Sequence, residues 1–140
     1  MPIQALARED VVHASRDASM SELAQLMRDR TVGSVVITND NAPVGIVTDR
    51  DLSTRVIAEE ASMESLSAAD VMTPNPTIAP ADTGLYEAAQ IMSENGVRRL
   101  PICDENNDLC GIITADDVIE LLADEHQHLA SIIQAQRPDY

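Results

Sequence analysis

The chain of 140 residues has the length of one ordinary domain, with 44% hydrophobic residues and a formal net charge of −15. Its 24 acidic residues face 9 basic ones, all of them arginine, because lysine is absent. Such a surface repels phosphates, which argues against non-specific binding to nucleic acid or anionic lipid. No apolar run approaches the ~20 residues of a membrane span, and the start of the chain lacks the basic and apolar segments of a signal peptide. We therefore expect a cytoplasmic protein.

The acidic, lysine-free composition with only 1% aromatic residues is typical of proteins from salt-loving archaea. Molar salt screens charges to within ~3 Å, so a chain of this charge tolerates its own repulsion there. A genome rich in G and C, which favours arginine codons, is the alternative explanation. We expect a halophilic, archaeal source.

The first half of the chain predicts a strand, a helix, two strands and a second helix. A short β-prone run over 11–14 precedes Asp17, which can cap a helix whose apolar residues recur at helical spacing over 17–27. Aliphatic strands over 32–38 and 44–48 follow, joined by a polar turn. A second helix then opens at Asp51.

The second half repeats this order. A shift of 65 residues aligns "DASMSELAQLM" (17–27) with "DTGLYEAAQIM" (82–92), and the shift becomes 66 after the longer second hairpin loop. Because a unit of about 60 residues is marginal alone, the two halves are expected to pack together. The predicted fold class is α/β (α+β), with two β-α-β-β-α repeats over 3–60 and 68–125 packed through their sheets about a pseudo-twofold axis. Residues 126–140 form a C-terminal helical extension.

Each repeat closes with the same strand-to-helix corner, "GIVTDRDL" (45–52) and "GIITADDV" (111–118). Thr48 with Asp51, and Thr114 with Asp117, have the spacing of a capping box that satisfies free N–H groups at a helix start. The glycine before each corner also permits close approach of a ligand. A carboxylate at the mouth of a cleft can accept hydrogen bonds from a ribose diol. Capping and ligand binding are compatible.

With "MTPNPTIAP" opening the second half and "GVRRLPICD" between its helix and its corner, the chain resembles a tandem pair of cystathionine β-synthase (CBS) domains, also called a Bateman module. The resemblance covers roughly residues 3–125. It implies a regulatory module, not an enzyme, that binds AMP, ADP, ATP or S-adenosylmethionine in clefts between the repeats. It also implies a homodimer that signals to a partner protein.

The resemblance further implies which side chains hold the ligand. Carboxylates and hydroxyls of the corners contact ribose or phosphate, the opening strands flank the adenine, and arginines meet phosphate. In that order the residues are Asp51, Asp117, Thr48 and Thr114; Thr77, Ile78, Val12 and His13; and Arg50, Arg98 and Arg99.

The two halves differ at the arginines. Arg98-Arg99 stands where the first half has Gly33-Ser34, and Asp116 stands where it has Arg50. Because family sites combine elements of both repeats, we expect Arg50 and Arg98 to reach the Thr114/Asp117 cleft, which would bind nucleotide more tightly. The Thr48/Asp51 cleft would have Asp116 near its phosphate end and be weak, empty or specific for a ligand without phosphate. Surface ion pairs with the abundant acids are the alternative role for Arg98 and Arg99.

Cys103 and Cys110 flank "DENND", and a two-residue turn at Asn106-Asn107 would place them opposite each other on a hairpin. In a reducing cytosol we interpret them as two small buried hydrophobes, with a disulfide or redox pair as the alternative.

The last stretch places Leu129, Ile132 and Ile133 at near-helical spacing. We expect a helix that reaches a second copy, the alternative being a helix that packs back on its own chain. His126 and His128 point to different helix faces, which argues against a shared metal ion.

Two other functions compete with ligand sensing. A structural dimerisation module would use the corners only as capping boxes. An enzyme would gather four carboxylates around a divalent metal ion, those of Asp49, Asp51, Asp116 and Asp117.

Overall fold

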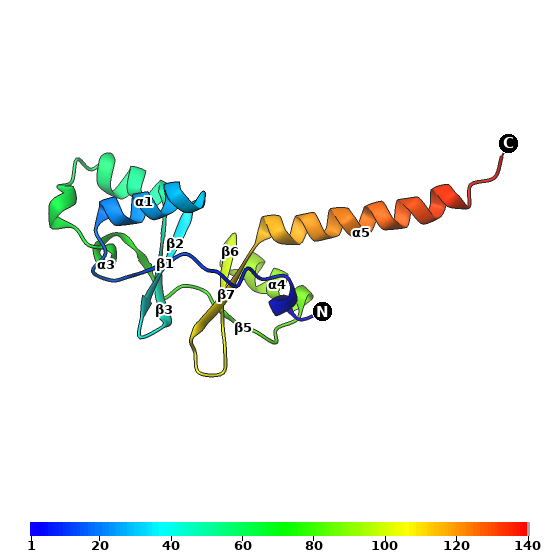
Figure 1. Ribbon diagram of the computed structural model, residues 1–140, viewed down its shortest axis with the longest axis horizontal. Helices are drawn as coiled ribbons and strands as arrows, with labels where there is room; N and C mark the ends of the chain where they lie inside the picture. The colour runs from blue at the N-terminus through cyan, green and yellow to red at the C-terminus, as the bar shows by residue number, and fades with distance from the viewer. Residues whose placement is uncertain (140) are drawn as a thin grey trace.

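The computed structural model describes residues 1–139 and contains two small sheets side by side, one for each half of the chain (Figure 1). In the first sheet β1 runs parallel to β2, and the remaining neighbours are antiparallel. In the second sheet β5 runs parallel to β6, and β6 is antiparallel to β7. The strands are β1 (His13–Ser15), β2 (Ser34–Asn39), β3 (Ala42–Thr48), β4 (Thr73–Pro74), β5 (Ala79–Pro80), β6 (Arg99–Cys103) and β7 (Leu109–Thr114). The predicted α/β fold class and the β-α-β-β-α order of each repeat are confirmed.

Helices α1 (Met20–Arg30) and α4 (Leu85–Asn95) occupy equivalent places, separated by the same shift of 65 residues. Their predicted caps, Asp17 and Asp82, are wrong, because α1 starts after Ser19 and α4 after Gly84. The Ser19 hydroxyl oxygen accepts a hydrogen bond of 3.1 Å from the N–H of Glu22 and so satisfies one free donor of the first turn.

The second helix differs in length between the repeats. In the first repeat α2 (Asp49–Asp51) continues into the π-helical η2 (Leu52–Ile57) and ends there. In the second repeat α5 (Ala115–Ala135) runs for 21 residues and extends away from the rest of the molecule (Figure 1). No helix within residues 1–139, α5 included, combines the length and the apolar character needed to cross a bilayer.

The segment that leads into each repeat packs on the other repeat. The short helix η1 (Ile3–Ala5) contributes the fully buried Ile3 to the second repeat's core, where its N–H donates to the Thr83 carbonyl at 2.8 Å. After η3 (Met63–Ser65), α3 (Ala68–Val71) contributes to the first core. Full burial of one aliphatic side chain stabilises the fold by about 1.5–3 kcal/mol. These crossed segments therefore hold the repeats together.

The crossing segments also pair with the last strand of the repeat that they reach. The N–H of Arg8 donates to the Ile112 carbonyl at 3.0 Å, and the N–H of Ile112 donates back to Arg8 at 3.1 Å. In the first sheet, Thr73 of β4 lies opposite Ile46 of β3 in the same way. Each corner is thereby covered on one side by a segment that leads into a repeat.

The cysteine hairpin differs from the predicted geometry. Cys103 lies opposite Leu109 instead of Cys110, because the register shifts after Ile102. Both thiols are free. Burial, followed by the effects of Cys110 and nearby acids, raises the pKa of Cys103 to about 11, and burial raises that of Cys110. Both thiols are therefore protonated at neutral pH, consistent with small hydrophobes and not with a reactive pair.

Candidate functional site

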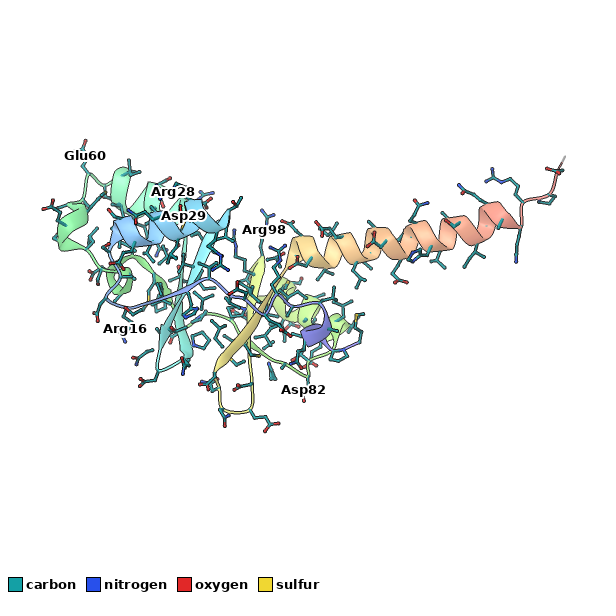
Figure 2. All side chains as sticks on the ribbon, viewed as in Figure 1. Arg16, Arg28, Asp29, Glu60, Asp82 and Arg98 are labelled. Carbon is teal, nitrogen blue, oxygen red and sulfur yellow. The ribbon has the colours of Figure 1, made fainter. Side chains whose placement is uncertain are left out.

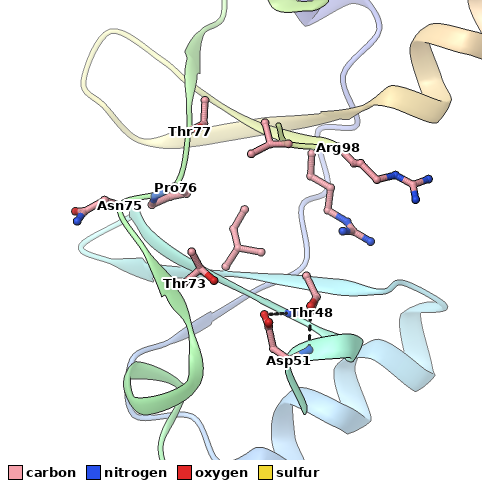
Figure 3. A pocket seen from close by; sticks show the side chains of 10 residues that line it. Thr48, Asp51, Thr73, Asn75, Pro76, Thr77 and Arg98 are labelled. Atoms are coloured by element: carbon pink, nitrogen blue, oxygen red, sulfur yellow. Dashed lines mark hydrogen bonds between the residues drawn. The ribbon is translucent and has the colours of Figure 1, made fainter. Parts of the chain in front are cut away.

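Both corners form capping boxes. The Thr48 hydroxyl oxygen accepts from the N–H of Asp51 at 3.1 Å, and Asp51 Oδ2 accepts from the N–H of Thr48 at 2.8 Å (Figure 3). The equivalent distances at Thr114 and Asp117 are 3.2 Å and 2.9 Å. Capping uses only one carboxylate oxygen in each box, so Oδ1 of each aspartate is available to another partner.

A cavity of about 260 Å³ opens beside the first corner. We call it the first cleft. Its wall combines the corner of the first repeat with the segment that leads into β5 and with the start of β6. In Figure 3 Arg98 enters from the second repeat, on the side opposite Thr48 and Asp51. The residues of the wall are Ile46, Thr48, Asp51, Thr73, Asn75, Pro76, Thr77, Val97, Arg98 and Arg99.

The first cleft contains three kinds of surface. Ile46, Pro76 and Val97 supply apolar contacts, whereas Asp51 supplies a carboxylate whose side chain is 16% exposed. Asp51 Oδ1 lies 3.6 Å from the Nε of Arg55, which is beyond hydrogen-bond distance. Two guanidinium groups complete the wall. A flat apolar ring, a diol and an anion therefore each find a complementary surface.

A second cavity, of about 300 Å³, is the repeat equivalent of the first. We call it the second cleft. Shifts of 65 or 66 residues convert every residue of the first cleft except Asp51 into a residue of this wall. The equivalents, in the order given for the first cleft, are Ile112, Thr114, Arg8, Asp10, Val11, Val12, Val32, Gly33 and Ser34. Thr31, Val36, Arg99, Asp116 and Glu120 also line it.

Asp117 is missing from the second wall because an arginine covers it. Arg8 Nη2 donates to Asp117 Oδ1 at 3.0 Å, and the carboxylate side chain is 10% exposed. The capping box already uses Oδ2, so both oxygens of Asp117 are engaged. The first cleft has Thr73 at the place of Arg8 and leaves the equivalent oxygen without a hydrogen bond. Our sequence alignment began at residue 17 and therefore missed Arg8, which the same shift of 65 would have found.

The arginines lie in the cleft opposite to the one predicted. Arg98 and Arg99 line the first cleft, with Thr48 and Asp51, and Arg98 is absent from the wall near Thr114. The carbonyl of Arg98 accepts from the N–H of Ala115, beside its own corner, but the side chain reaches the corner of the other repeat.

Arg99 belongs to both walls. Its Nη2 lies 3.3 Å from the position that a Cβ on Gly33 would take, so the guanidinium group reaches over the first repeat. Arg50 is exposed and lines neither cleft. Asp116 lines the second cleft, not the phosphate end of the first, but its Oδ1 lies 3.5 Å from Arg98 Nη2.

Of the residues predicted to flank an adenine, half lie in the clefts. Thr77 lines the first cleft and Val12 the second. Ile78 is 36% exposed and outside the first wall. His13 faces a different, acidic hollow, with its Nδ1 3.0 Å from the Val11 carbonyl oxygen. Sequence reasoning missed other residues of the first wall, namely Thr73, Asn75, Pro76 and Val97.

The carboxylates of the corners do not form a metal site. Within residues 1–139, no three His, Cys, Asp or Glu side chains converge as metal ligands. Asp49 and Asp116 are exposed, while Asp51 and Asp117 serve separate capping boxes. The arrangement expected of a metal-dependent enzyme is therefore not found in this part of the chain.

Comparisons with known proteins agree with the duplicated architecture. The family model of the CBS domain matches residues 3–58 and 68–124. An uncharacterised protein of Methanopyrus kandleri is 37% identical over 117 residues, which are 83% of this chain and 60% of that protein. This chain therefore spans less than two thirds of that relative's length.

Two solved structures share the fold. One is a CBS domain protein from Pyrobaculum aerophilum complexed with AMP, with a TM-score of 0.75 and 22% identity over 84% of this chain and 89% of that one. The other is the CBS domain pair of protein MJ0100 in complex with 5′-methylthioadenosine and S-adenosyl-L-methionine. Its TM-score is 0.78 at 21% identity, covering 87% of this chain and 99% of that one. With both repeats matched by the family model, this chain belongs to the CBS domain family, as a tandem pair of CBS domains.

Proposed function

We propose that this chain is a regulatory module that binds an adenosine nucleotide in the first cleft. The observation that carries the proposal is the joint presence, in one cavity, of a carboxylate oxygen without a hydrogen bond and two guanidinium groups. These belong to Asp51, Arg98 and Arg99. The structural neighbours that contain AMP or S-adenosylmethionine support a ligand of this class.

Each part of a nucleotide has a complementary surface in this cleft. The ribose hydroxyls donate to Asp51, with Thr48 beside it, and the phosphate accepts from the two arginines. The adenine packs against the apolar side chains, next to Thr77. Because S-adenosylmethionine carries a cationic sulfonium where a nucleotide carries phosphate, the two arginines favour AMP, ADP or ATP.

The second cleft has the weaker affinity in this proposal, which reverses the ranking expected from the sequence. A ribose there must displace Arg8 from Asp117, and a phosphate must approach the carboxylates of Asp10, Asp116 and Glu120. Both requirements oppose binding of an anionic nucleoside.

Signalling follows from where the first cleft lies. Its ligand touches the corner of one repeat and β6 of the other, so binding favours the relative pose of the repeats that closes this cavity. A second copy of the chain or a regulated protein partner reads that pose. A purely structural module, in which the corners act only as helix caps, is the competing function because both capping boxes are complete.

Calorimetric titration with AMP, ATP, adenosine and S-adenosylmethionine tests the proposal, with Asp51→Asn compared to Asp117→Asn. Both substitutions remove the charge of one capping carboxylate, so each controls for the other's effect on folding. We expect Asp51→Asn to weaken AMP binding about tenfold to a hundredfold, the equivalent of 1.5–3 kcal/mol, and Asp117→Asn to leave it nearly unchanged. Equal losses would contradict the assignment to the first cleft. If no compound raises the melting temperature, the structural module is correct.

A further inference from the structure

The outer part of α5 carries an apolar face that nothing in the described chain covers. Ile119, Leu122, Leu129, Ile132 and Ile133 are between 51% and 65% exposed. In Figure 2 the side chains of this part of the helix stand clear of every other element. The helix therefore does not pack back on its own chain. The family match ends at residue 124, so most of this face lies outside the CBS domains.

This face continues one that is already used for packing. In the first turn of α5, Ala115 and Val118 pack against the second core. Leu122 follows Val118 by four residues, and Leu129 lies seven residues further along the same side. The surface that meets the body of the protein therefore runs on past its edge.

The spacing of the face is that of a two-helix seam. Ile119, Leu122, His126, Leu129 and Ile133 follow one another at alternating intervals of three and four residues. This is the a/d pattern of a coiled coil. A helix of 21 residues is about 31 Å long, so the seam has room for several layers of contacts.

Charge selects the partner and its direction. Residues 115–125 contain five acids, which are Asp116, Asp117, Glu120, Asp124 and Glu125, and no base. Residues 126–137 contain no acid but include Arg137 and two histidines. A parallel pair of α5 helices would align the two acidic halves, whereas an antiparallel pair aligns each acidic half with the neutral to basic half. The helix is thus complementary to itself in the reversed direction.

We propose that α5 pairs antiparallel with α5 of a second copy of this chain, through Ile119, Leu122, Leu129 and Ile133. In this register Leu122 packs against the partner's Ile133, and His126 packs against the partner's Leu129. The two bodies lie at opposite ends of the paired helices. Because each copy carries a net charge of −15, salt that screens this repulsion tightens the dimer.

Sedimentation equilibrium of the full chain tests the interface. We expect a dimer at about 100 µM protein, a concentration that nearly saturates a Kd of about 10 µM. Leu129→Glu, on the seam, should sediment near the monomer mass of 15.1 kDa. The matched control is Gln127→Glu, which adds the same charge off the seam and should remain a dimer. A monomeric wild type, or a Leu129→Glu variant as dimeric as the wild type, would overturn the proposal.

Two cysteine variants test the direction. A mixture of Leu122→Cys and Ile133→Cys should form a disulfide-linked dimer on mild oxidation, whereas each variant alone should not. The native cysteines give little background because burial raises the pKa of Cys103 to about 11 and also raises that of Cys110. Crosslinking of Leu122→Cys alone would show a parallel pair and refute the antiparallel arrangement.

The dimer and the nucleotide site are tested independently. Leu129 lies beyond both cores and outside both clefts. Leu129→Glu should therefore retain the far-UV circular dichroism spectrum and the melting behaviour of the body. If nucleotide binding fails in every variant while the dimer forms as described, only the proposed function is refuted.

Discussion

The first cleft has two arginines and one carboxylate in its wall, whereas the second has two arginines and three carboxylates. The backbone elements that build them are equivalent, and so are almost all positions of their walls. The difference lies in four substitutions between the repeats. They are Thr73 for Arg8, Asn75 for Asp10, Arg98 for Gly33 and Arg99 for Ser34.

This comparison separates what duplication conserves from what it leaves free to vary. The capping boxes and the crossed strands recur because they hold the corner in place, and their energies are similar in both repeats. The side chains that face the cavity carry little of that stability. They can therefore diverge until one cleft favours an anion and the other is closed by an internal ion pair.

The largest expected effect on the comparison comes from Arg98→Gln. Arg98 lines only the first cleft, so its loss removes a charge-assisted contact to the phosphate there. We expect AMP to bind about tenfold more weakly, and adenosine, which has no phosphate, to bind as before. Isothermal titration calorimetry with the two ligands measures the difference directly.

Arg50→Gln is the matched control for this prediction. It removes the same charge from an exposed side chain that lines neither cleft. Equal weakening of AMP binding by both substitutions would attribute the effect to net charge instead of contact.

The second expected effect is a gain of binding, in Arg8→Thr. This change gives the second cleft the residue that the first has at the equivalent place, and it frees Oδ1 of Asp117. Adenosine is the suitable probe, because the loss of Arg8 also removes a positive charge that a phosphate would contact. In an Asp51→Asn background, which weakens the first cleft, we expect residual adenosine affinity to rise about fivefold to tenfold.

Arg50→Thr in the same background controls for the loss of one charge. No gain in Arg8→Thr would mean that the ion pair with Asp117 does not keep ribose out of the second cleft. The acidic wall, and not the arginine, would then account for the difference between the clefts.

The fold could be predicted from the sequence because its signals are local and occur twice. The shift of 65 residues fixes both helices, and hydrophobic alternation fixes β2 with β3 and β6 with β7. The exchange of Ile3 and α3 between cores could not be predicted, since short lead-in segments have no periodicity that names their partner. The bulge after Ile102 was missed for a similar reason, because it depends on the turn and not on the strands.

The candidate site was predicted in composition but not in assignment. Thr48, Asp51, Thr77 and the two arginines do meet, yet sequence reasoning placed Arg98 with Asp117. Which way a side chain points from the end of a strand decides between two clefts that lie on either side of it. That direction depends on the pairing of repeats, which one sequence alone does not contain.

The smallest expected effect comes from Asp116→Asn, which acts on the link between the clefts. Asp116 Oδ1 lies 3.5 Å from Arg98 Nη2, with the two side chains 70% and 76% exposed. A pair this exposed contributes about 0.2–1 kcal/mol, and a phosphate in the first cleft must compete with it. Removal of the carboxylate should strengthen AMP binding about twofold to fivefold, and the gain should shrink in molar salt. Asp124→Asn removes a charge from the same helix outside both clefts, so a similar gain there would show that repulsion by the whole protein, and not the contact with Arg98, limits nucleotide affinity.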